Sequence, residues 1–269
     1  MYTYAQLLCL SLLFLGACSK QISTQTENPE NEGNEMIFDS TKALIRLVSA
    51  DLPLINSLTL LGESVDIEGT KPLEGNLTIE LVDKAVFEAK KSTAITFLQA
   101  DTNTVKKKNG VIELICAQKT KIYIDKPDVK DEVQVYEYVG TIDFLNQYLI
   151  KGAYYEGTRY HVIDKTNGEE TAIFIGYPHI SADKKHLICV YTNPYERTCE
   201  MSVFSIVGKQ ITSKLSTSFS QWMPLYEKED AFWGADGFFY LTAMHSKAFW
   251  KEDGSLNENR QYLRIKVLK

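Results

Sequence analysis

Hydrophobic and polar residues alternate in short segments along the chain from about residue 105 onward. β-Branched and aromatic residues dominate these segments, and turn-forming residues separate them. This pattern predicts antiparallel hairpins, because successive side chains of a strand face opposite sides of a sheet. The predicted strand pairs are Val111–Cys116 with Lys121–Asp125, Tyr148–Tyr154 with Tyr160–Asp164, His186–Tyr191 with Cys199–Ile206, and Phe238–Ala243 with Tyr262–Val267. We therefore expect a mainly β fold.

The preceding segment, residues 37–105, is predicted to form a small N-terminal subdomain of β or α+β type beside a β-domain of residues 106–269. Lys42–Val48 and Ser57–Leu61 have the composition of strands. The stretch Leu77–Lys91 contains apolar residues spaced four apart, which suits one short amphipathic helix, and it suits a strand equally well. Both assignments stay open for that stretch.

Two pairs of segments in the β-domain resemble each other. Tyr160–Thr171 aligns with Met201–Thr212 at an offset of 41, with a strand followed by a glycine turn in each. Ala182–Ile188 aligns with Ala235–Leu241, a turn followed by an apolar strand. A period of about 40–45 residues with four short strands per unit is typical of a β-propeller blade.

The segments Tyr160–Gly168 and Ile180–Ile188 carry a family resemblance. Their order, a strand with a D-x-x-x-G turn and then an S-P-D-G-K-like turn and a strand, resembles tricorn-like and WD-like propeller repeats. The chain has Ala182 and Lys184 where those repeats prefer proline and glycine. The resemblance covers about residues 130–269 and implies an open or incomplete propeller of antiparallel repeats. A full ring and a twisted stack of antiparallel sheets are the alternatives.

The N-terminus has the layout of an export signal. An apolar core, Leu7–Leu15, precedes small residues and is too short to span a bilayer as a stable anchor. The residues Leu15–Cys18 resemble a bacterial lipobox. The resemblance implies a lipoprotein signal peptide of residues 1–17, cleavage before Cys18, and attachment of acyl chains such as palmitate to Cys18. A plain signal peptide with an incidental cysteine is the alternative, and residues 1–6 lack the usual lysine or arginine.

Residues 18–36 are predicted to be a disordered tether. They are rich in Ser, Thr, Gln, Asn and Glu and contain almost no apolar residue that a core could bury. The lipid would make the membrane a partner and place the protein in the bacterial cell envelope. Ser19 after the cysteine favours the outer over the inner membrane in a cell that has both.

Composition and charge favour a globular protein and argue against a nucleic-acid-binding protein. The chain of 269 residues has 44% hydrophobic and 24% charged residues, which suits a globular protein with a sizeable core. The net charge of −6 and a longest basic run of only Lys106–Lys108 argue against nucleic acid as a partner, because such binding needs a basic face.

Three cysteines lie in the expected folded part, namely Cys116, Cys189 and Cys199. Export permits disulfides, and a hairpin loop at residues 192–197 would bring Cys189 and Cys199 nearly opposite each other. Two alternatives follow: a Cys189–Cys199 bridge, or two buried thiols.

The candidate catalytic motifs are weak. Ser181 and Lys184 have the S-x-x-K spacing of some serine acyl-transferases, but Asp183 and the neighbouring lysines indicate a solvated turn. The four histidines show no pair spaced for a helical zinc site, and the nucleotide-binding glycine motifs are absent from the sequence. We predict no metal and no cofactor.

Aromatic residues supply the remaining signal, at 11% of the chain. Most of them are expected to fill the space between sheets. Tyr155, Tyr177, Trp233 and Trp250 are expected in loops, where they would form a platform for a sugar ring or a protein partner.

We therefore expect a lipid-anchored envelope protein that acts as a non-catalytic binding module for a protein or carbohydrate ligand. An immunity or inhibitor lipoprotein is one alternative. A propeller-based hydrolase is another, and it would require a deep pocket that holds at least two of His161, His179, Asp164 and Glu156.

Overall fold

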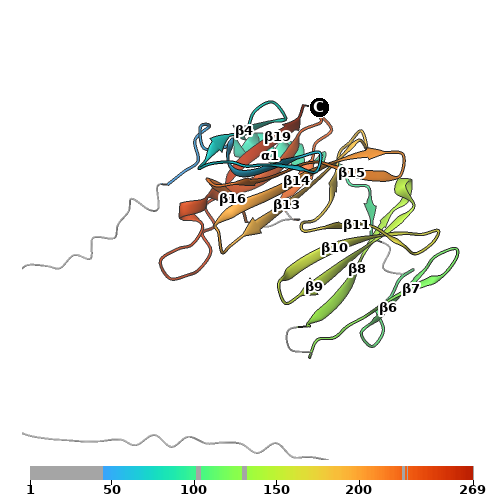
Figure 1. The fold of residues 1–269 in the computed structure, drawn as a ribbon. Helices are drawn as coiled ribbons and strands as arrows, with labels where there is room; N and C mark the ends of the chain where they lie inside the picture. The colour runs from blue at the N-terminus through green and yellow to red at the C-terminus, as the bar shows by residue number, and fades with distance from the viewer. Residues whose placement is uncertain (1–44, 101–103, 129–131, 226–227, 229, 269) are drawn as a thin grey trace, which may run out of the picture. The chain divides into compact units, whose positions relative to one another are not determined.

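The computed structural model describes residues 45–100, 104–128, 132–225, 228 and 230–268 (Figure 1). Strands account for 53% and helices for 7% of the structure. The strand content is more than twice that of an average globular domain. All the strand pairs of the described residues are antiparallel, so the prediction of a mainly β, antiparallel fold is confirmed.

The first large sheet is an antiparallel meander with one added edge strand. Its strands, in spatial order, are β11 (Glu170–Phe174), β10 (Gly157–Asp164), β9 (Gln147–Tyr154), β8 (Gln134–Ile142) and β5 (Leu98–Gln99). A 3₁₀ helix, η2 (Asp143–Leu145), joins β8 to β9. Gly140 allows β5 to approach β8, since a Cβ there would lie 2.4 Å from the Gln99 carbonyl oxygen.

A separate hairpin covers one face of this sheet. It consists of β6 (Val111–Ile115) and β7 (Thr120–Ile124), which pair with each other. The inward residues Ile112, Leu114 and Tyr123 are buried against Tyr148 and Ile150 of the sheet. The alternation of buried and exposed residues along both strands follows from this one-sided contact.

The second large sheet combines another meander with N-terminal strands. Its strands are β12 (His179–Ile180), β13 (His186–Asn193), β14 (Thr198–Val207), β15 (Gln210–Phe219), β1 (Leu54–Leu60), β2 (Glu63–Val65) and β3 (Lys71–Pro72). β1 pairs with β15 and also with β2 and β3.

The third large sheet draws its strands from both ends of the described chain. They are β16 (Trp222–Pro224), β17 (Ala231–Trp233), β18 (Phe239–His245), β19 (Gln261–Val267) and β4 (Leu77–Val82). A 3₁₀ helix, η3 (Ser246–Ala248), follows β18. The helix α1 (Lys84–Lys91) follows β4 and buries Phe87 against Phe232, Tyr240 and Tyr262.

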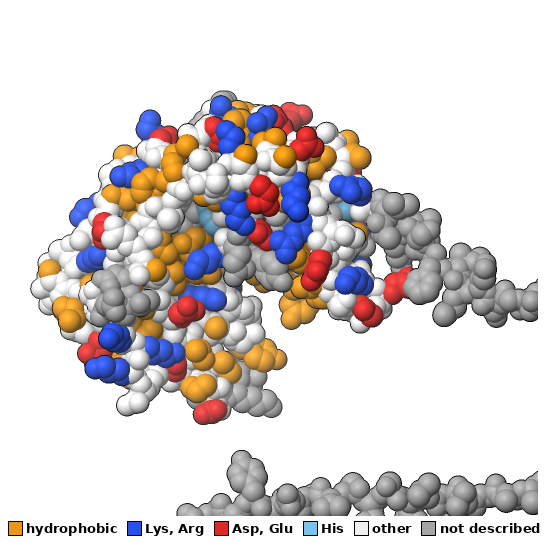
Figure 2. All heavy atoms as spheres, turned by 180° about the vertical axis from the view of Figure 1, so that it is seen from behind, with side chains coloured by type: hydrophobic (Ala, Val, Ile, Leu, Met, Phe, Trp, Pro, Cys, Tyr) orange, Lys and Arg blue, Asp and Glu red, His pale blue; other side chains and the backbone are white. Residues whose placement is uncertain are grey.

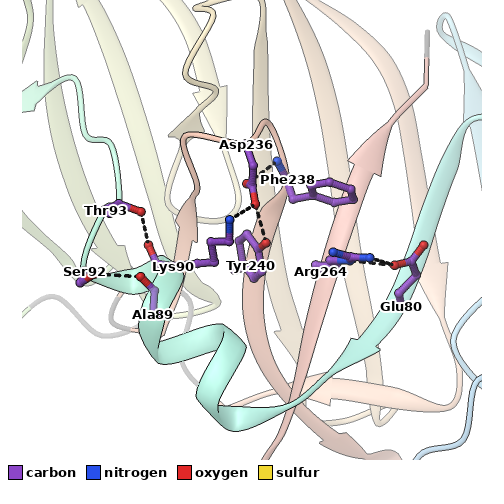
Figure 3. A network of polar contacts seen from close by, with 9 residues as sticks. All are labelled: Glu80, Ala89, Lys90, Ser92, Thr93, Asp236, Phe238, Tyr240 and Arg264. Atoms are coloured by element: carbon purple, nitrogen blue, oxygen red, sulfur yellow. Dashed lines mark hydrogen bonds and ion pairs between the residues drawn. The ribbon is translucent and has the colours of Figure 1, made fainter.

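Polar contacts fix α1 and the edge of this third sheet (Figure 3). Lys90 lies 2.9 Å from a carboxylate oxygen of Asp236, and Asp236 also accepts a hydrogen bond from Tyr240 at 2.9 Å. Arg264 of β19 pairs with Glu80 of β4, with its Nε atom 2.7 Å from the carboxylate. These contacts join a helix and a strand from the N-terminal part of the chain to its C-terminal strands.

The second sheet lies between the first and the third, because both of its faces are buried. Ile188 and Val190 pack in one core cluster with Trp222 and Phe239 of the third sheet. The alternate residues Leu187 and Cys189 pack in another cluster with residues of the first sheet such as Leu149 and Val162. Burial on both faces explains the continuous apolar run of β13.

The hairpins predicted from the alternation are confirmed, with β6–β7, β9–β10, β13–β14 and β18–β19 paired as expected. The ambiguous stretch Leu77–Lys91 contains both elements, the strand β4 and the helix α1. The strand predicted at Lys42–Val48 is wrong for residues 45–48, which are not in a strand, and residues 42–44 lie outside the described part. Strands of residues 37–105 pair with all three large sheets, through β1, β4 and β5.

The two repeat alignments correspond to equivalent hairpins. Tyr160–Thr171 and Met201–Thr212 include the turns of β10–β11 and β14–β15, the last two strands of successive meanders. Ala182–Ile188 and Ala235–Leu241 include the turns of β12–β13 and β17–β18.

The possible Cys189–Cys199 bridge is not formed, and the alternative of two buried thiols holds. Cys189 lies opposite Ser202, whereas Cys199 lies opposite Thr192. The two thiols therefore point to opposite faces of the second sheet and pack in different core clusters. Burial raises the pKa of the Cys199 thiol well above its ordinary value, so this thiol stays protonated and unreactive.

Candidate functional site

A small cavity lies where the three large sheets meet. It has a volume of about 230 Å³ and is lined by residues 94–98 and 177–180, by β17 and by Lys228. Its floor is buried and largely apolar, while Ala94, Thr96 and Lys228 at its rim are exposed. We name it the junction cavity.

Two of the four predicted aromatic residues, Tyr177 and Trp233, line the junction cavity together. The expectation of a loop position is wrong for Trp233, which is the last residue of β17 and is only 2% exposed. Its indole Nε1 donates a hydrogen bond to the His179 carbonyl oxygen at 2.9 Å. The Ile95 amide donates to the Trp233 carbonyl oxygen at 3.1 Å. Trp233 is therefore held through its indole by His179 and through its backbone by Ile95, and both of these residues line the cavity.

Tyr177 contributes an aromatic ring that carries a hydroxyl group to the lining of the junction cavity. Its ring packs edge-on against Tyr160 and His179, with centroids 5.6 and 4.8 Å away, and Lys228 Nζ lies 5.2 Å from its centroid. The Tyr177 hydroxyl forms no hydrogen bond with a described residue. Burial raises the pKa of Tyr177 to about 12, so the phenol stays protonated at neutral pH and can donate to a bound group.

The chemistry of the junction cavity suits one apolar group with a hydrogen-bonding atom. Drug-sized pockets have volumes of about 300–1,000 Å³, so this cavity accepts a single ring or side chain and not a whole large ligand. For such a group, apolar walls would provide affinity, and the Tyr177 hydroxyl and the Lys228 ammonium would be available to orient it.

A second depression, which we name the turn groove, lies at the end of the first sheet. It is lined by residues 132–134, residues 154–157 and Arg159, with a volume of about 540 Å³. Tyr155, a predicted binding residue, is in the turn between β9 and β10 and is 72% exposed. Arg159 Nη1 donates to the Thr158 carbonyl oxygen at 2.9 Å.

A chain of hydrogen bonds begins at Tyr154, which lines the turn groove. The Tyr154 hydroxyl is 2.7 Å from His161 Nε2, and His161 Nδ1 is 2.7 Å from a carboxylate oxygen of Glu170. Burial, together with the neighbouring Tyr136 hydroxyl, raises the pKa of Tyr154 well above its ordinary value. Tyr154 is thus a protonated, oriented hydroxyl and a poor nucleophile.

A β-bulge creates this Tyr154–His161–Glu170 chain. The register between β10 and β11 shifts between Val162 and Ile163, so Glu170 pairs with Ile163. An unbroken register would place Glu170 opposite Asp164 and on the other face of the sheet. Sequence reasoning therefore missed this contact, because no residue pattern reveals the bulge.

The other predicted residues lie elsewhere. Trp250, which is 39% exposed, packs on Phe249 in the connection between β18 and β19. The four aromatic residues are thus divided between the junction cavity, the turn groove and this connection.

The residues named for a hydrolase pocket are also dispersed. His179 lines the junction cavity, Glu156 lines the turn groove and His161 is hydrogen-bonded to Tyr154 of that groove. Asp164 caps the turn after β10, where it accepts a hydrogen bond from the Thr166 amide at 2.6 Å.

The Ser181-x-x-Lys184 motif forms the turn between β12 and β13. The Ser181 hydroxyl donates to Asp183 at 2.6 Å, and the Lys184 ammonium lies 5.0 Å from the ring centroids of both Phe97 and Phe144. Partial burial acts to raise the pKa of Asp183, but hydrogen bonds from Ser181 and the Lys185 amide hold it below its ordinary value. Ser181 thus faces a carboxylate and not a lysine base.

The described residues contain neither a candidate metal site nor a candidate membrane-spanning helix. No group of three or more His, Cys, Asp or Glu side chains in that part of the chain can hold a metal ion. No helix within the described ranges is long and apolar enough to span a membrane. On the face shown in Figure 2, basic and acidic side chains are interspersed, without a large patch of one sign.

Comparison with protein-family models, with curated proteins and with solved structures gives no match. The function is therefore argued from the geometry of the two depressions.

Proposed function

We propose that this protein is a lipid-anchored, non-catalytic binding module of the bacterial cell envelope, and that its junction cavity holds one apolar group of a protein or carbohydrate ligand. The observation that carries the proposal is the position of Tyr177 and Trp233, which line one cavity although they are 56 residues apart in the sequence. A pocket with apolar walls and a few convergent polar groups is typical of ligand sites.

We further propose an open, propeller-like arrangement of the sheets. Successive antiparallel four-stranded units support it: β8–β11, β12–β15, and a third unit in which β4 from the N-terminal part completes β17, β18 and β19. Propeller blades surround a central channel. The junction cavity, which residues of all three units line, would correspond to that channel.

The lipid anchor rests on Cys18, which lies outside the described residues, and the outer membrane is its proposed address. Expression in a bacterial host with radiolabelled palmitate tests the anchor. We expect label in the protein and recovery of the protein with outer-membrane vesicles. Cys18→Ser should abolish both, and label that persists in the variant would contradict acylation at this residue.

The binding role is tested by NMR with p-cresol, which has a ring and a hydroxyl of the kind that the junction cavity suits. The indole N–H resonance of Trp233 should shift on titration. Trp222 is an internal control, because its indole is fully buried and donates to the Leu52 carbonyl oxygen at 3.0 Å.

Tyr177→Phe should weaken p-cresol binding about fivefold, the effect of one lost hydrogen bond. Tyr123→Phe removes another buried phenolic hydroxyl, remote from the cavity, and should change nothing. If p-cresol shifts no indole resonance, or shifts that of Trp222 equally, the junction cavity is not a ligand site.

A further inference from the structure

We propose that the turn groove is a second ligand site, which binds a neutral, polyhydroxylated ligand such as a sugar ring. This site is separate from the junction cavity and does not depend on the lipid anchor. Its volume of about 540 Å³ lies within the usual range of small-molecule pockets.

Tyr155 provides the apolar surface of the site. It lies in the tight turn between β9 and β10 and is 72% exposed, so its ring face meets water. The face of an aromatic ring is electron-rich, and the polarised C–H bonds on one side of a sugar ring carry partial positive charge. Stacking of a sugar on Tyr155 would bury apolar surface on both partners.

The charges of the turn groove favour a ligand that can both donate and accept hydrogen bonds. Glu132 and Glu156 line it, and neither forms an ion pair with a described residue. Arg159 also has no carboxylate partner in the described part of the chain. The two carboxylates outnumber the one guanidinium, so a ligand anion would be repelled. A ligand cation could pair with the carboxylates but would leave the Arg159 guanidinium without an acceptor. A hydroxyl group both donates and accepts hydrogen bonds, so it can satisfy all three side chains.

Two further side chains have a fixed hydrogen-bond direction. The Gln134 Oε1 atom accepts a hydrogen bond from the Tyr136 hydroxyl at 2.9 Å, which leaves the Gln134 amide nitrogen to donate to a ligand. A carboxylate only accepts hydrogen bonds, so Glu170 places the proton of the neutral imidazole on His161 Nδ1. Nε2 then accepts from Tyr154, whose oxygen neighbours the Tyr136 hydroxyl and can also accept a hydrogen bond from a ligand hydroxyl.

Gly152 leaves the space that the Tyr154 ring occupies. A Cβ at this position would lie 2.7 Å from both Tyr154 Cε2 and its hydroxyl oxygen. Because Gly152 has no side chain, the Tyr154 ring can pack along its own strand, β9, and its hydroxyl can reach His161. The groove combines an exposed ring with oriented donors and acceptors, which is the recognition chemistry of carbohydrates.

Saturation-transfer NMR with four trisaccharides at millimolar concentration tests the proposal: maltotriose, cellotriose, mannotriose and chitotriose. At least one should bind the unaltered protein. Arg159→Ala should weaken this binding at least about tenfold, because charged hydrogen bonds are the stronger ones. Tyr155→Ala should weaken it about fivefold or more. Tyr195→Ala is the matched control, since Tyr195 is a 95% exposed turn tyrosine on another sheet.

The positioning role of Glu170 has its own readout. Tyr154→Phe should weaken binding of the trisaccharide about fivefold. Glu170→Ala should have a similar effect, because without the carboxylate the His161 proton is no longer fixed on Nδ1 and Nε2 no longer orients the Tyr154 hydroxyl. The double variant should bind no more weakly than Tyr154→Phe alone, since both changes remove the same interaction. Strictly additive losses would overturn this role.

Either of two results would overturn the site itself: no trisaccharide of the four binds, or binding survives both Arg159→Ala and Tyr155→Ala. Tyr155 and Arg159 lie at the groove surface, and thermal unfolding of each variant checks that the fold is retained. Failure here leaves the p-cresol experiment on the junction cavity unaffected.

Discussion

The junction cavity and the turn groove each contain a tyrosine beside a histidine, yet the two pairs are in opposite states. In the junction cavity Tyr177 meets His179 ring to ring, and its hydroxyl has no hydrogen bond with a described residue. In the turn groove the Tyr154 hydroxyl is bound to His161 at 2.7 Å. The position of each pair relative to the sheets makes the difference: one is enclosed where three sheets meet, and the other lies at the end of a single sheet.

The comparison shows how one pair of residue types serves two kinds of recognition. In an apolar wall, a phenol hydroxyl that has no hydrogen bond with a described residue is a single polar group. It can orient a ligand, while the burial of apolar surface provides the affinity. A phenol whose direction is fixed by a buried imidazole and a carboxylate gives one member of a polar network. The predictions that follow separate the two cases.

The largest expected difference between the two sites is in the free energy of unfolding, because Trp233 is buried and Tyr155 is exposed. Trp233→Ala should lower the free energy of unfolding by about 3–5 kcal/mol, because it removes a buried indole ring from the core. Tyr155→Ala should change it by less than about 0.5 kcal/mol, since the ring is exposed. Urea unfolding measures both. Equal losses in the two variants would contradict the assignment of one residue to the core and the other to the surface.

Alkaline pH should test the burial of Tyr177. Its folded pKa of about 12 exceeds the ordinary value of 10.0, so the associated stability is fully present below pH 10 and is lost as the pH rises toward 12. The loss amounts to at most about 2–3 kcal/mol. Unfolding free energies between pH 9 and 11 should fall less steeply in Tyr177→Phe than in the unaltered protein. Identical slopes would mean that the phenol is solvated.

A smaller effect is expected from Gly152→Ala in the turn groove. The added methyl group displaces the Tyr154 ring and costs about 1–2 kcal/mol of stability, as overpacking and a lost hydrogen bond would. The variant Gly152→Ala/Tyr154→Ala is the control, because without the ring the methyl group has no clash there. Thermal unfolding should show the two changes to be non-additive; simple additivity would exclude the proposed ring position.

The local parts of this fold could be predicted from the sequence, and the long-range parts could not. The four hairpins follow from alternation and turns within about 30 residues. The pairing of β4 with β19 joins residues almost 200 positions apart, and no local pattern indicates it. Residues 45–48 have strand-like composition but no strand, because composition alone does not supply a pairing partner.

The candidate sites were predictable to a similar extent. The content of aromatic residues pointed to Tyr155, Tyr177 and Trp233 as candidates. Trp233 was expected in a loop, whereas long-range packing buries its indole in the core. The hydrogen-bond chain Tyr154–His161–Glu170 depends on a one-residue β-bulge, which no sequence pattern indicates.

One measurement tests directly whether the two depressions are separate sites with different chemistry. Protein with labelled tryptophan and tyrosine side chains is titrated by NMR, first with p-cresol and then with the trisaccharide that binds best. We predict that p-cresol shifts the Trp233 indole resonance and leaves the Tyr155 ring unchanged, and that the trisaccharide does the reverse. Shifts of the same resonances by both ligands would contradict the account.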